Sequence, residues 1–271
     1  MTKMIKEELK RGYDTIGLIL SLLMGFGCII YKNYVLLSHD FKMQKYFRNY
    51  QGYVIFNRGN FYCRWLYSYI DPSMLYLFYF MGIIAALPYG VSYYQDKKKG
   101  IIRNICIRTE KSHYLSAKYL AVFFTGGTVV ALPLVLDLLI SKLSYPYDFI
   151  RILGTPLNGV SDWMRFTIDH IYVAALLVIL LWFLFGGFLA TVSLVVSCVA
   201  DNVFTIQLIP FLLMLVLFYI PGMLPFSYRR YFPFNFLRIN NDIVQAFLEV
   251  ILLSILTFLS FFVIEKRKDI L

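Results

Sequence analysis

The chain has 271 residues, of which 59% are hydrophobic and only 15% are charged, with 25 Phe and 22 Tyr. This composition is that of a membrane protein and excludes an ordinary soluble core. The formal net charge is +10, but the basic residues flank apolar segments without a groove-reading helix or zinc spacing. We therefore expect anionic lipid and a protein as partners, and no nucleic acid.

The four cysteines lie far apart in the sequence. They are Cys28, Cys63, Cys106 and Cys198, and no two of them have C-x-x-C spacing. This distribution predicts neither a disulfide framework nor a metal site.

The N-terminal segment, residues 1–15, has the pattern of an amphipathic helix. Its apolar stripe consists of Met1, Met4, Ile5, Leu9 and Tyr13. The opposite side carries Lys3, Lys6, Lys10 and Arg11. A helix of this kind suits the surface of the inner leaflet.

Apolar segments near the length needed to cross a bilayer, about 20 residues, recur along the chain. We expect six transmembrane helices, at residues 16–37, 73–92, 114–140, 171–199, 203–220 and 243–264. Spans of this kind are helical because lipid cannot satisfy unpaired backbone groups. The predicted fold class is therefore all-α, a polytopic membrane protein in which residues 1–271 form a single transmembrane domain.

The distribution of basic residues orients these spans. Fourteen of the 26 Lys and Arg residues lie in segments 1–15, 93–118 and 265–271, which are shorter in total than the segments on the other side. By the positive-inside rule we expect the N- and C-termini and the loop 93–113 to be cytoplasmic, in the plasma membrane.

The loop 93–113 carries a second amphipathic pattern. Gly100 allows a break, and a short helix over residues 101–108 would place Ile101, Ile102 and Ile105 on one side and Lys99 and Arg103 on the other. Such a helix can lie on the inner leaflet or press its isoleucines into a groove on a soluble partner. A solvated loop with no special role is the third interpretation.

Two acidic residues fall within predicted spans: Asp137 in the third and Glu249 in the sixth. Ionisable groups at membrane depth are costly and often functional. A structural role, at the outer interface or paired with a nearby Arg, and a role in a substrate path both remain open.

Small residues recur at spacings that let helices approach closely. They are Gly82, Ala86 and Gly90 in the second span, and Gly186, Ala190, Ser193 and Ser197 in the fourth. Packing within the chain and a subunit interface are both compatible with these rows.

The sequence offers no machinery for nucleotide hydrolysis. A phosphate-binding loop needs the pattern G-x-x-x-x-G-K-[ST], whose Lys reaches the phosphates. The segment "GTPLNGVS" from Gly154 has both glycines but Val160 in place of that Lys. We therefore expect no enzyme activity and no cofactor bound by this chain.

The loop contains Asp96 and the run "GIIRNI" from Gly100, and the third span begins with "SHYLSAK" from Ser112 to Lys118. In these residues the chain resembles the membrane subunits of type 2 ATP-binding-cassette (ABC) exporters. The six-span count and the N-terminal amphipathic helix extend the resemblance. The loop sequence "GIIRN" is similar to that of Gram-positive peptide-antibiotic immunity and export permeases.

The resemblance implies a permease that forms a homodimer or pairs with a sister permease and moves an amphipathic substrate, such as a peptide, antibiotic or lipid-like molecule. ATP and Mg would bind to a separate ABC ATPase subunit. The loop would supply a coupling helix that contacts this subunit. The implied contact residues are Asp96, Lys98, Lys99, Gly100, Ile101, Ile102, Arg103 and Ile105.

Two other functions remain as alternatives. An integral membrane enzyme or scaffold acting on lipid would need convergent polar residues at one depth. A secondary carrier would need paired broken helices and ionisable groups at the midplane, for which Asp137 and Glu249 are the only candidates.

Overall fold

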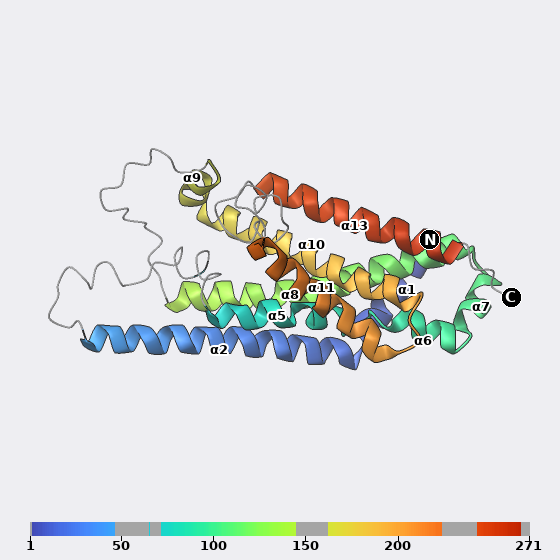
Figure 1. The fold of residues 1–271 in the computed structure, drawn as a ribbon, viewed down its shortest axis with the longest axis horizontal. Helices are drawn as coiled ribbons and strands as arrows, with labels where there is room; N and C mark the ends of the chain where they lie inside the picture. The colour runs from blue at the N-terminus through green and yellow to red at the C-terminus, as the bar shows by residue number, and fades with distance from the viewer. Residues whose placement is uncertain (1, 47–64, 66–71, 145–161, 224–242, 267–271) are drawn as a thin grey trace.

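The computed structural model describes residues 2–46, 65, 72–144, 162–223 and 243–266, and these ranges are helical apart from short connections (Figure 1). No strand occurs within them, so the all-α prediction is confirmed for this part of the chain. Cys63 and the "GTPLNGVS" segment lie outside the described residues.

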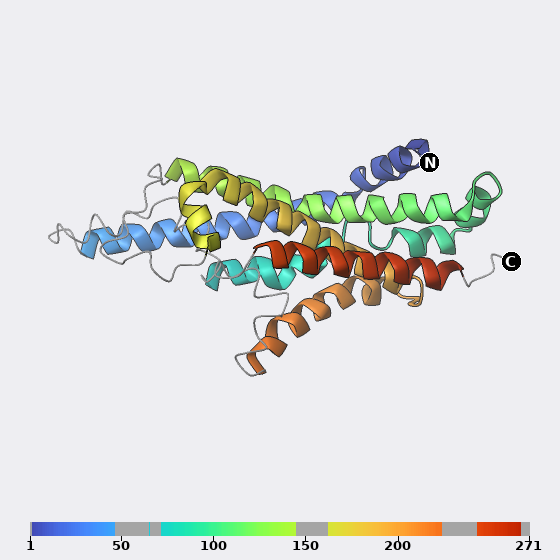
Figure 2. The ribbon, with the colours of Figure 1, turned by 90° about the horizontal axis from the view of Figure 1, so that it is seen from above.

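Six long helices run roughly along one axis and form the body of the molecule (Figures 1 and 2). They are α2 (Ile16–Tyr46), α5 (Pro72–Ala86), α8 (Lys111–Ser144), α10 (Ile171–Ser197), α11 (Val203–Met223) and α13 (Ile243–Lys266). A short helix, α9 (Asp162–Asp169), precedes α10. The core lies mainly between α8 and α10, where Val129, Phe185 and Leu189 are fully buried.

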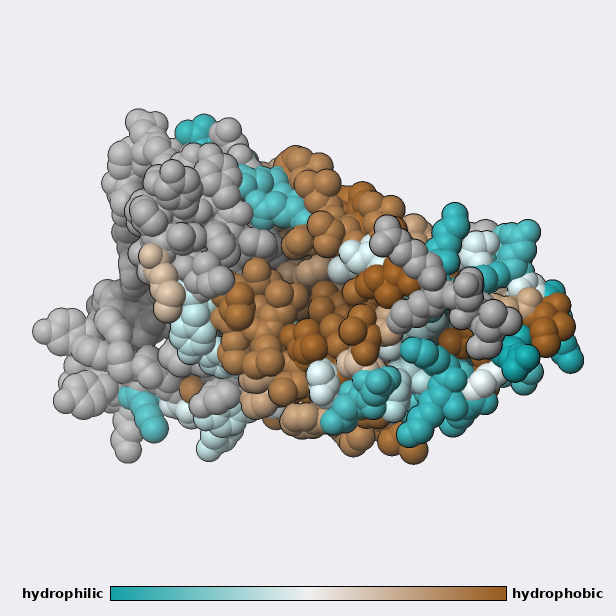
Figure 3. Space-filling view, turned by 45° about the vertical axis from the view of Figure 1, so that its right-hand side comes forward, coloured by the Kyte–Doolittle hydropathy of each residue, from teal (hydrophilic) through white to brown (hydrophobic). Residues whose placement is uncertain are grey.

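Four helical segments are long and apolar enough to cross a membrane: Ile16–Ser38, Lys111–Ser144, Ile171–Ser197 and Ile243–Lys266. Their outward sides are apolar, and Leu23, Leu252 and Leu256 are more than half exposed. Figure 3 shows the resulting apolar surface over the middle of the molecule, with hydrophilic residues gathered at one end. The chain is therefore a membrane protein.

The predicted span 73–92 is not one continuous helix. The described helix α5 ends at Ala86, and residues 87–91 form turns before α6 (Ser92–Lys98) begins. Pro88 explains the interruption, since proline has no backbone N–H and disfavours helical geometry at the preceding residue. This turn lies directly before the loop 93–113, which carries the second amphipathic pattern.

One end of the bundle collects elements that are distant in sequence. The N-terminal helix α1 (Thr2–Tyr13), α6, α7 (Ile101–Cys106), the start of α8 and the end of α13 all lie there (Figures 1 and 2). The N-terminal segment, the loop and the C-terminal end of the last helix thus share one side of the molecule, as the charge distribution predicts.

The apolar stripe of α1 packs mainly against the protein. Met4 and Leu9 are half-buried against the core. A Cβ placed on Gly12 would lie 2.7 Å from Thr125 Cγ2 of α8, so the two helices touch closely. Tyr13 remains 41% exposed, and its hydroxyl lies 2.8 Å from Thr128 Oγ1. The contact of this stripe is therefore largely with α8.

The rows of small residues are used inside the chain. Gly82 of α5 faces the backbone of α11, where a Cβ would lie 2.6 Å from Pro210 O. Gly186 of α10 faces Val130 of α8, and a Cβ there would lie 2.7 Å from Val130 Cγ2. Of the two interpretations left open by the sequence, packing within the chain describes these positions.

Candidate functional site

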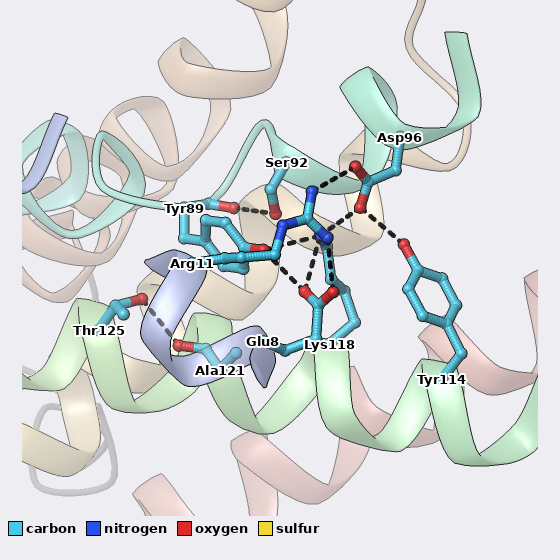
Figure 4. A network of polar contacts seen from close by, with 9 residues as sticks. All are labelled: Glu8, Arg11, Tyr89, Ser92, Asp96, Tyr114, Lys118, Ala121 and Thr125. Carbon is cyan, nitrogen blue, oxygen red and sulfur yellow. Dashed lines mark hydrogen bonds and ion pairs between the residues drawn. The ribbon is translucent and has the colours of Figure 1, made fainter. Parts of the chain in front are cut away.

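Six polar side chains from α1, the α5–α6 turn, α6 and α8 meet in what we call the buried ion cluster (Figure 4). Its members are Glu8, Arg11, Tyr89, Asp96, Tyr114 and Lys118. They come from segments up to 110 positions apart in the sequence. The cluster therefore joins α1, α6 and α8, which are separated along the sequence.

Lys118 lies at the centre of the cluster. Its side chain is completely buried, and its Nζ lies 2.6 Å from Asp96 Oδ2, 3.1 Å from Glu8 Oε2 and 3.2 Å from Tyr89 Oη. An ammonium group has three N–H donors, so these three acceptors match its capacity. The same nitrogen lies 4.4 Å from the centre of the Tyr89 ring, within the range of a cation–π contact.

Asp96 of α6 accepts hydrogen bonds from both neighbouring helices. Arg11 Nη2 of α1 donates to Oδ1 at 2.9 Å, and Tyr114 Oη of α8 donates to Oδ2 at 2.9 Å. Burial alone would raise the pKa of the Asp96 carboxyl, but the charges of Lys118 and Arg11 outweigh it and lower that pKa below its usual value. Asp96 is therefore ionised at neutral pH.

Glu8 completes the charge balance. Its Oε1 accepts a hydrogen bond from Arg11 Nη1 at 2.7 Å, and its Oε2 accepts one from Tyr89 Oη at 2.7 Å. Two carboxylates thus face two cations, which is the condition under which buried charges are tolerated. Both carboxylates have all of their oxygens paired within the cluster, so the arrangement connects helices and leaves no open coordination position for a reactant.

Helical spacing explains why these side chains converge. Glu8 and Arg11 are three residues apart on α1, and Tyr114 and Lys118 are four apart on α8, so each pair lies on one helix face. On α1, Glu8 falls within the apolar stripe, next to Leu9 and four residues after Met4. A carboxylate in that stripe was the signal that could have identified Glu8 as a buried partner.

The resemblance implied that Asp96 contacts an ATPase subunit, whereas in the structure it is only 2% exposed. Its burial is tolerated because Lys118 and Arg11 pair with its carboxylate. In the structure, Asp96 therefore makes its contacts within the chain.

The predicted short helix is present but smaller and turned inward. It is α7, Ile101–Cys106, shorter than the predicted 101–108, and Gly100 begins it in the left-handed region with φ 67°, as the predicted break requires. Ile102 is 7% exposed and belongs to the core. Ile105 is half-buried against the same core, so these two isoleucines face their own bundle, and Ile101 is half-buried.

The polar residues of the implied contact lie on the outside. Lys98, Lys99 and Arg103 are exposed, as is Gly100. Of the eight implied contact residues, these four are exposed, Ile101 and Ile105 are half-buried, and Asp96 and Ile102 are buried.

Further contacts fasten α6 and the start of α8 to the rest of the bundle. Tyr94 Oη donates to Asp201 O between α10 and α11 at 2.9 Å. Lys111 Nζ donates to Glu265 O at the end of α13 at 2.6 Å. Burial, together with a hydrogen bond to the Glu265 side chain, raises the pKa of Tyr93 above its usual range. The α6–α7 segment is thus tied to α1, α8, α13 and the α10–α11 connection.

A second buried polar group joins α2 to α8. Lys32 Nζ lies 2.6 Å from Asp137 Oδ2, and both side chains are fully buried. Asn33 Nδ2 donates to Asp137 Oδ1 at 2.8 Å. The partner of Asp137 is therefore a lysine of α2, where a nearby arginine or the outer interface was expected.

Glu249 occupies a different environment on α13. It is half-buried, and its Oε1 accepts a hydrogen bond from Gln245 Nε2 at 2.9 Å, one turn earlier on the same helix. Asp137 and Glu249 therefore have separate partners, on α2 and α13 respectively.

The part of the chain that the structure describes contains no group of three His, Cys, Asp or Glu side chains that could hold a metal ion. Its cysteines, Cys28, Cys106 and Cys198, form no disulfide with one another.

Comparison with protein-family models, with curated proteins and with solved structures finds no match to this chain.

Proposed function

We propose that this chain is the permease subunit of an ATP-driven exporter of the type 2 ABC class. It moves an amphipathic substrate such as a peptide, an antibiotic or a lipid-like molecule out of the membrane. It works as a homodimer or with a sister permease, and a separate ATPase subunit binds ATP and Mg. The resemblance of the loop and of the segment Ser112–Lys118 motivates this proposal.

One observation carries the proposal furthest: Asp96 of α6 is bound at once to Lys118 of α8 and to Arg11 of α1. The α6–α7 segment projects at the end of the bundle, between the turn that follows α5 and the start of the long helix α8. A displacement of α6–α7 would therefore act on α8 and α1 together, which supports a coupling role for this segment.

The mechanism follows from this connection. Closure of the ATPase subunits on ATP would displace α6–α7, and the buried ion cluster would carry the displacement into α1 and α8. Because packed helices have discrete arrangements, such a displacement favours one packing of the bundle over another. The alternation between inward-facing and outward-facing shapes would then move the substrate.

We propose six spans, with the N-terminus, the C-terminus and α6–α7 in the cytoplasm and the chain in the plasma membrane. The two spans beyond the four long ones would be α5 with the turn that follows it, and α11, which carries the shorter apolar segment Val203–Leu217. The side of the membrane on which each segment lies can be tested with single cysteines in a cysteine-free chain. We expect Thr109→Cys to react with an impermeant maleimide only after cells are permeabilised, and Leu143→Cys to react in intact cells.

The function is tested by reconstituting the chain with a purified ABC ATPase from the same organism. We expect the chain alone to hydrolyse no ATP, and the pair to form a complex whose ATP hydrolysis exceeds that of the ATPase alone. Robust hydrolysis by the isolated chain, or an ATPase that neither binds nor responds to it, would contradict the proposal.

The Lys32–Asp137 pair gives some support to a second function, that of a secondary carrier, because ionisable groups inside spans mark ion pathways in such proteins. Both groups are fully paired in the structure, which favours a structural role. Uptake into proteoliposomes driven by a proton gradient without ATP would support the carrier.

A further inference from the structure

Helix α1 presents a row of cations on the face that does not pack against the bundle. Lys3, Lys6 and Lys10, which we call the lysine row, are all exposed. At about 100° per residue, these three lysines and Tyr13 fall within an arc of about 80°, and the exposed acidic residue of the helix, Glu7, lies outside it. None of the residues that the structure describes forms an ion pair with the lysine row. Its charge is therefore left for a ligand outside the chain.

The start of α2 fixes the depth of the lysine row in the membrane. The apolar span from Ile16 to Ser38 has 23 residues, which is about 35 Å of helix and close to the hydrocarbon thickness of about 30 Å. Ile16 therefore marks the edge of the hydrocarbon layer. Lys10 lies six residues earlier in the sequence, and the headgroup layer beside the hydrocarbon is about 5–8 Å thick. The lysine row thus begins at the level of the lipid headgroups.

The same face of α1 adjoins side chains that meet lipid tails. Tyr13 Oη lies 2.8 Å from Thr128 Oγ1 of α8. One turn from Thr128 in each direction, Phe124 and Leu132 are 40% and 42% exposed. At the start of α2, Ile16 is 77% exposed. A row of cations therefore lies beside an apolar, lipid-facing surface, with a tyrosine at the boundary where tyrosines are enriched in membrane proteins.

We propose that the lysine row and Tyr13 bind the phosphate headgroup of an anionic glycerophospholipid, whose acyl chains lie against the exposed side chains of α2 and α8 beside them. Ammonium groups form charge-assisted hydrogen bonds with phosphate oxygens. Only a ligand that also has a hydrocarbon part contacts the apolar surface at the same time. The inference does not depend on the proposed function, because it requires only that the chain is a membrane protein.

This site differs from the usual way in which an amphipathic helix binds a membrane, by burying its apolar face among the lipid tails. In α1 that face is occupied by protein, since Met4 and Leu9 pack against the core and Gly12 touches α8. The polar face remains for lipid. Electrostatic attraction to the headgroup therefore carries the binding, and we expect it to require a net negative lipid.

The lipid site is linked to the buried ion cluster through α1. Glu8 and Arg11 of the same helix bind Lys118 and Asp96. A lipid that holds α1 at the membrane surface favours the position in which these residues meet their partners. Because a ligand stabilises the arrangement to which it binds, we expect anionic phospholipid to slow amide hydrogen exchange in α1.

The test uses the full chain in detergent micelles, titrated with phosphatidylglycerol or with zwitterionic phosphatidylcholine, and native mass spectrometry measures the bound lipid. One lysine near an anionic surface strengthens binding about fivefold. We expect the triple variant Lys3→Gln, Lys6→Gln, Lys10→Gln to bind phosphatidylglycerol at least tenfold more weakly and phosphatidylcholine as before. Replacing the same three residues by Arg should preserve binding, because the charge is kept.

The matched control removes three exposed cations from the same end of the molecule. It is the triple variant Lys97→Gln, Lys98→Gln, Lys99→Gln, at the end of α6. We expect this control to bind phosphatidylglycerol within about twofold of the unmodified chain, since its substitutions lie outside the site. An equal loss of affinity in both triple variants would mean that binding follows net charge, and the site would be wrong.

Two further outcomes would overturn the assignment. Glycerophosphoglycerol carries the same headgroup without acyl chains. If it competes with phosphatidylglycerol at equal concentration, the lysine row binds soluble phosphate compounds and the ligand is not a lipid. If phosphatidylglycerol slows hydrogen exchange in α1 no more than phosphatidylcholine does, the link between the lipid and the position of α1 is wrong.

Discussion

Lys118 Nζ of α8 and Asp96 Oδ2 of α6 lie 2.6 Å apart, and both side chains are buried. The two residues are separated by 22 positions that include the whole of α7. Their contact joins α6 to α8, on either side of α7. From α1, Arg11 binds Asp96 and Glu8 binds Lys118. The N-terminal helix is thereby part of the structure that positions the projecting segment.

Removing the central cation should destabilise the protein strongly. Lys118→Met leaves Glu8 and Asp96 buried with a single remaining cation, Arg11. Breaking a buried ion pair in this way typically costs about 3–5 kcal/mol. We expect a correspondingly large loss in the free energy of unfolding, measured by denaturant titration in detergent micelles.

The matched control for this variant is Lys98→Met, which removes an exposed lysine of the same segment. Exposed ion pairs contribute roughly 0–1 kcal/mol, so the control should unfold almost as the unmodified chain does. Equal losses for the two variants would show that the cluster does not hold the fold together.

The pH dependence of the unfolding free energy should reveal the stability that the ionised Asp96 carboxylate contributes. Its pKa is lowered in the folded protein, so its ionised form adds stability that is complete above the ordinary pKa of about 3.9. That stability is lost as the pH falls through the lower folded-state value. The difference in unfolding free energy between the unmodified chain and Asp96→Asn should therefore stay constant from pH 7 to pH 5 and shrink only below about pH 4.

Asp14→Asn serves as the control for the pH experiment, because Asp14 is exposed at the α1–α2 connection. A difference for Asp96→Asn that already shrinks between pH 7 and pH 5 would mean that the folded-state pKa is raised, contrary to the pairing with Lys118 and Arg11.

The Lys32–Asp137 pair allows a test of its two possible roles. Lys32→Met or Asp137→Leu alone leaves one buried charge unpaired and should cost about 3–5 kcal/mol. The double variant removes both charges and should recover much of that loss, because a buried pair is often replaceable by apolar residues. Unfolding of all four chains in one detergent gives the coupling energy.

Transport by the double variant then separates structure from function. If the pair only joins α2 to α8, the stable double variant should transport at close to the normal rate. A double variant that folds but does not transport would place Lys32 and Asp137 on the substrate path.

The contact between α5 and α11 should be sensitive to a single methyl group. A Cβ at Gly82 would lie 2.6–2.7 Å from backbone atoms of Pro210 and Phe211, whereas a Cβ at Gly27 of α2 would have no atom within 4 Å. Overpacking against backbone costs typically 1–3 kcal/mol. We expect Gly82→Ala to lower the thermal unfolding temperature and Gly27→Ala to leave it unchanged or slightly higher.

The sequence by itself determined the helical class, the membrane environment and several local features. Long apolar segments require helices because lipid satisfies no backbone group, and this requirement does not depend on which helices are neighbours. The break at Gly100 and the short helix after it follow from a left-handed backbone position and from periodicity within six residues. The grouping of the N-terminal segment, the loop and the end of the last helix followed from the distribution of Lys and Arg.

Only the tertiary structure decided which side chains meet. Periodicity predicts that Ile101, Ile102 and Ile105 share a face of α7, but not whether that face meets a partner or its own bundle. In the same way, the sequence marks Asp96 and Asp137 as notable, yet their cations, Lys118 and Lys32, come from other helices. These pairings depend on how helices pack across 22 and 105 residues of chain. Because the energy of a buried charge depends on the position of its counter-charge, no pattern within a single helix can specify it.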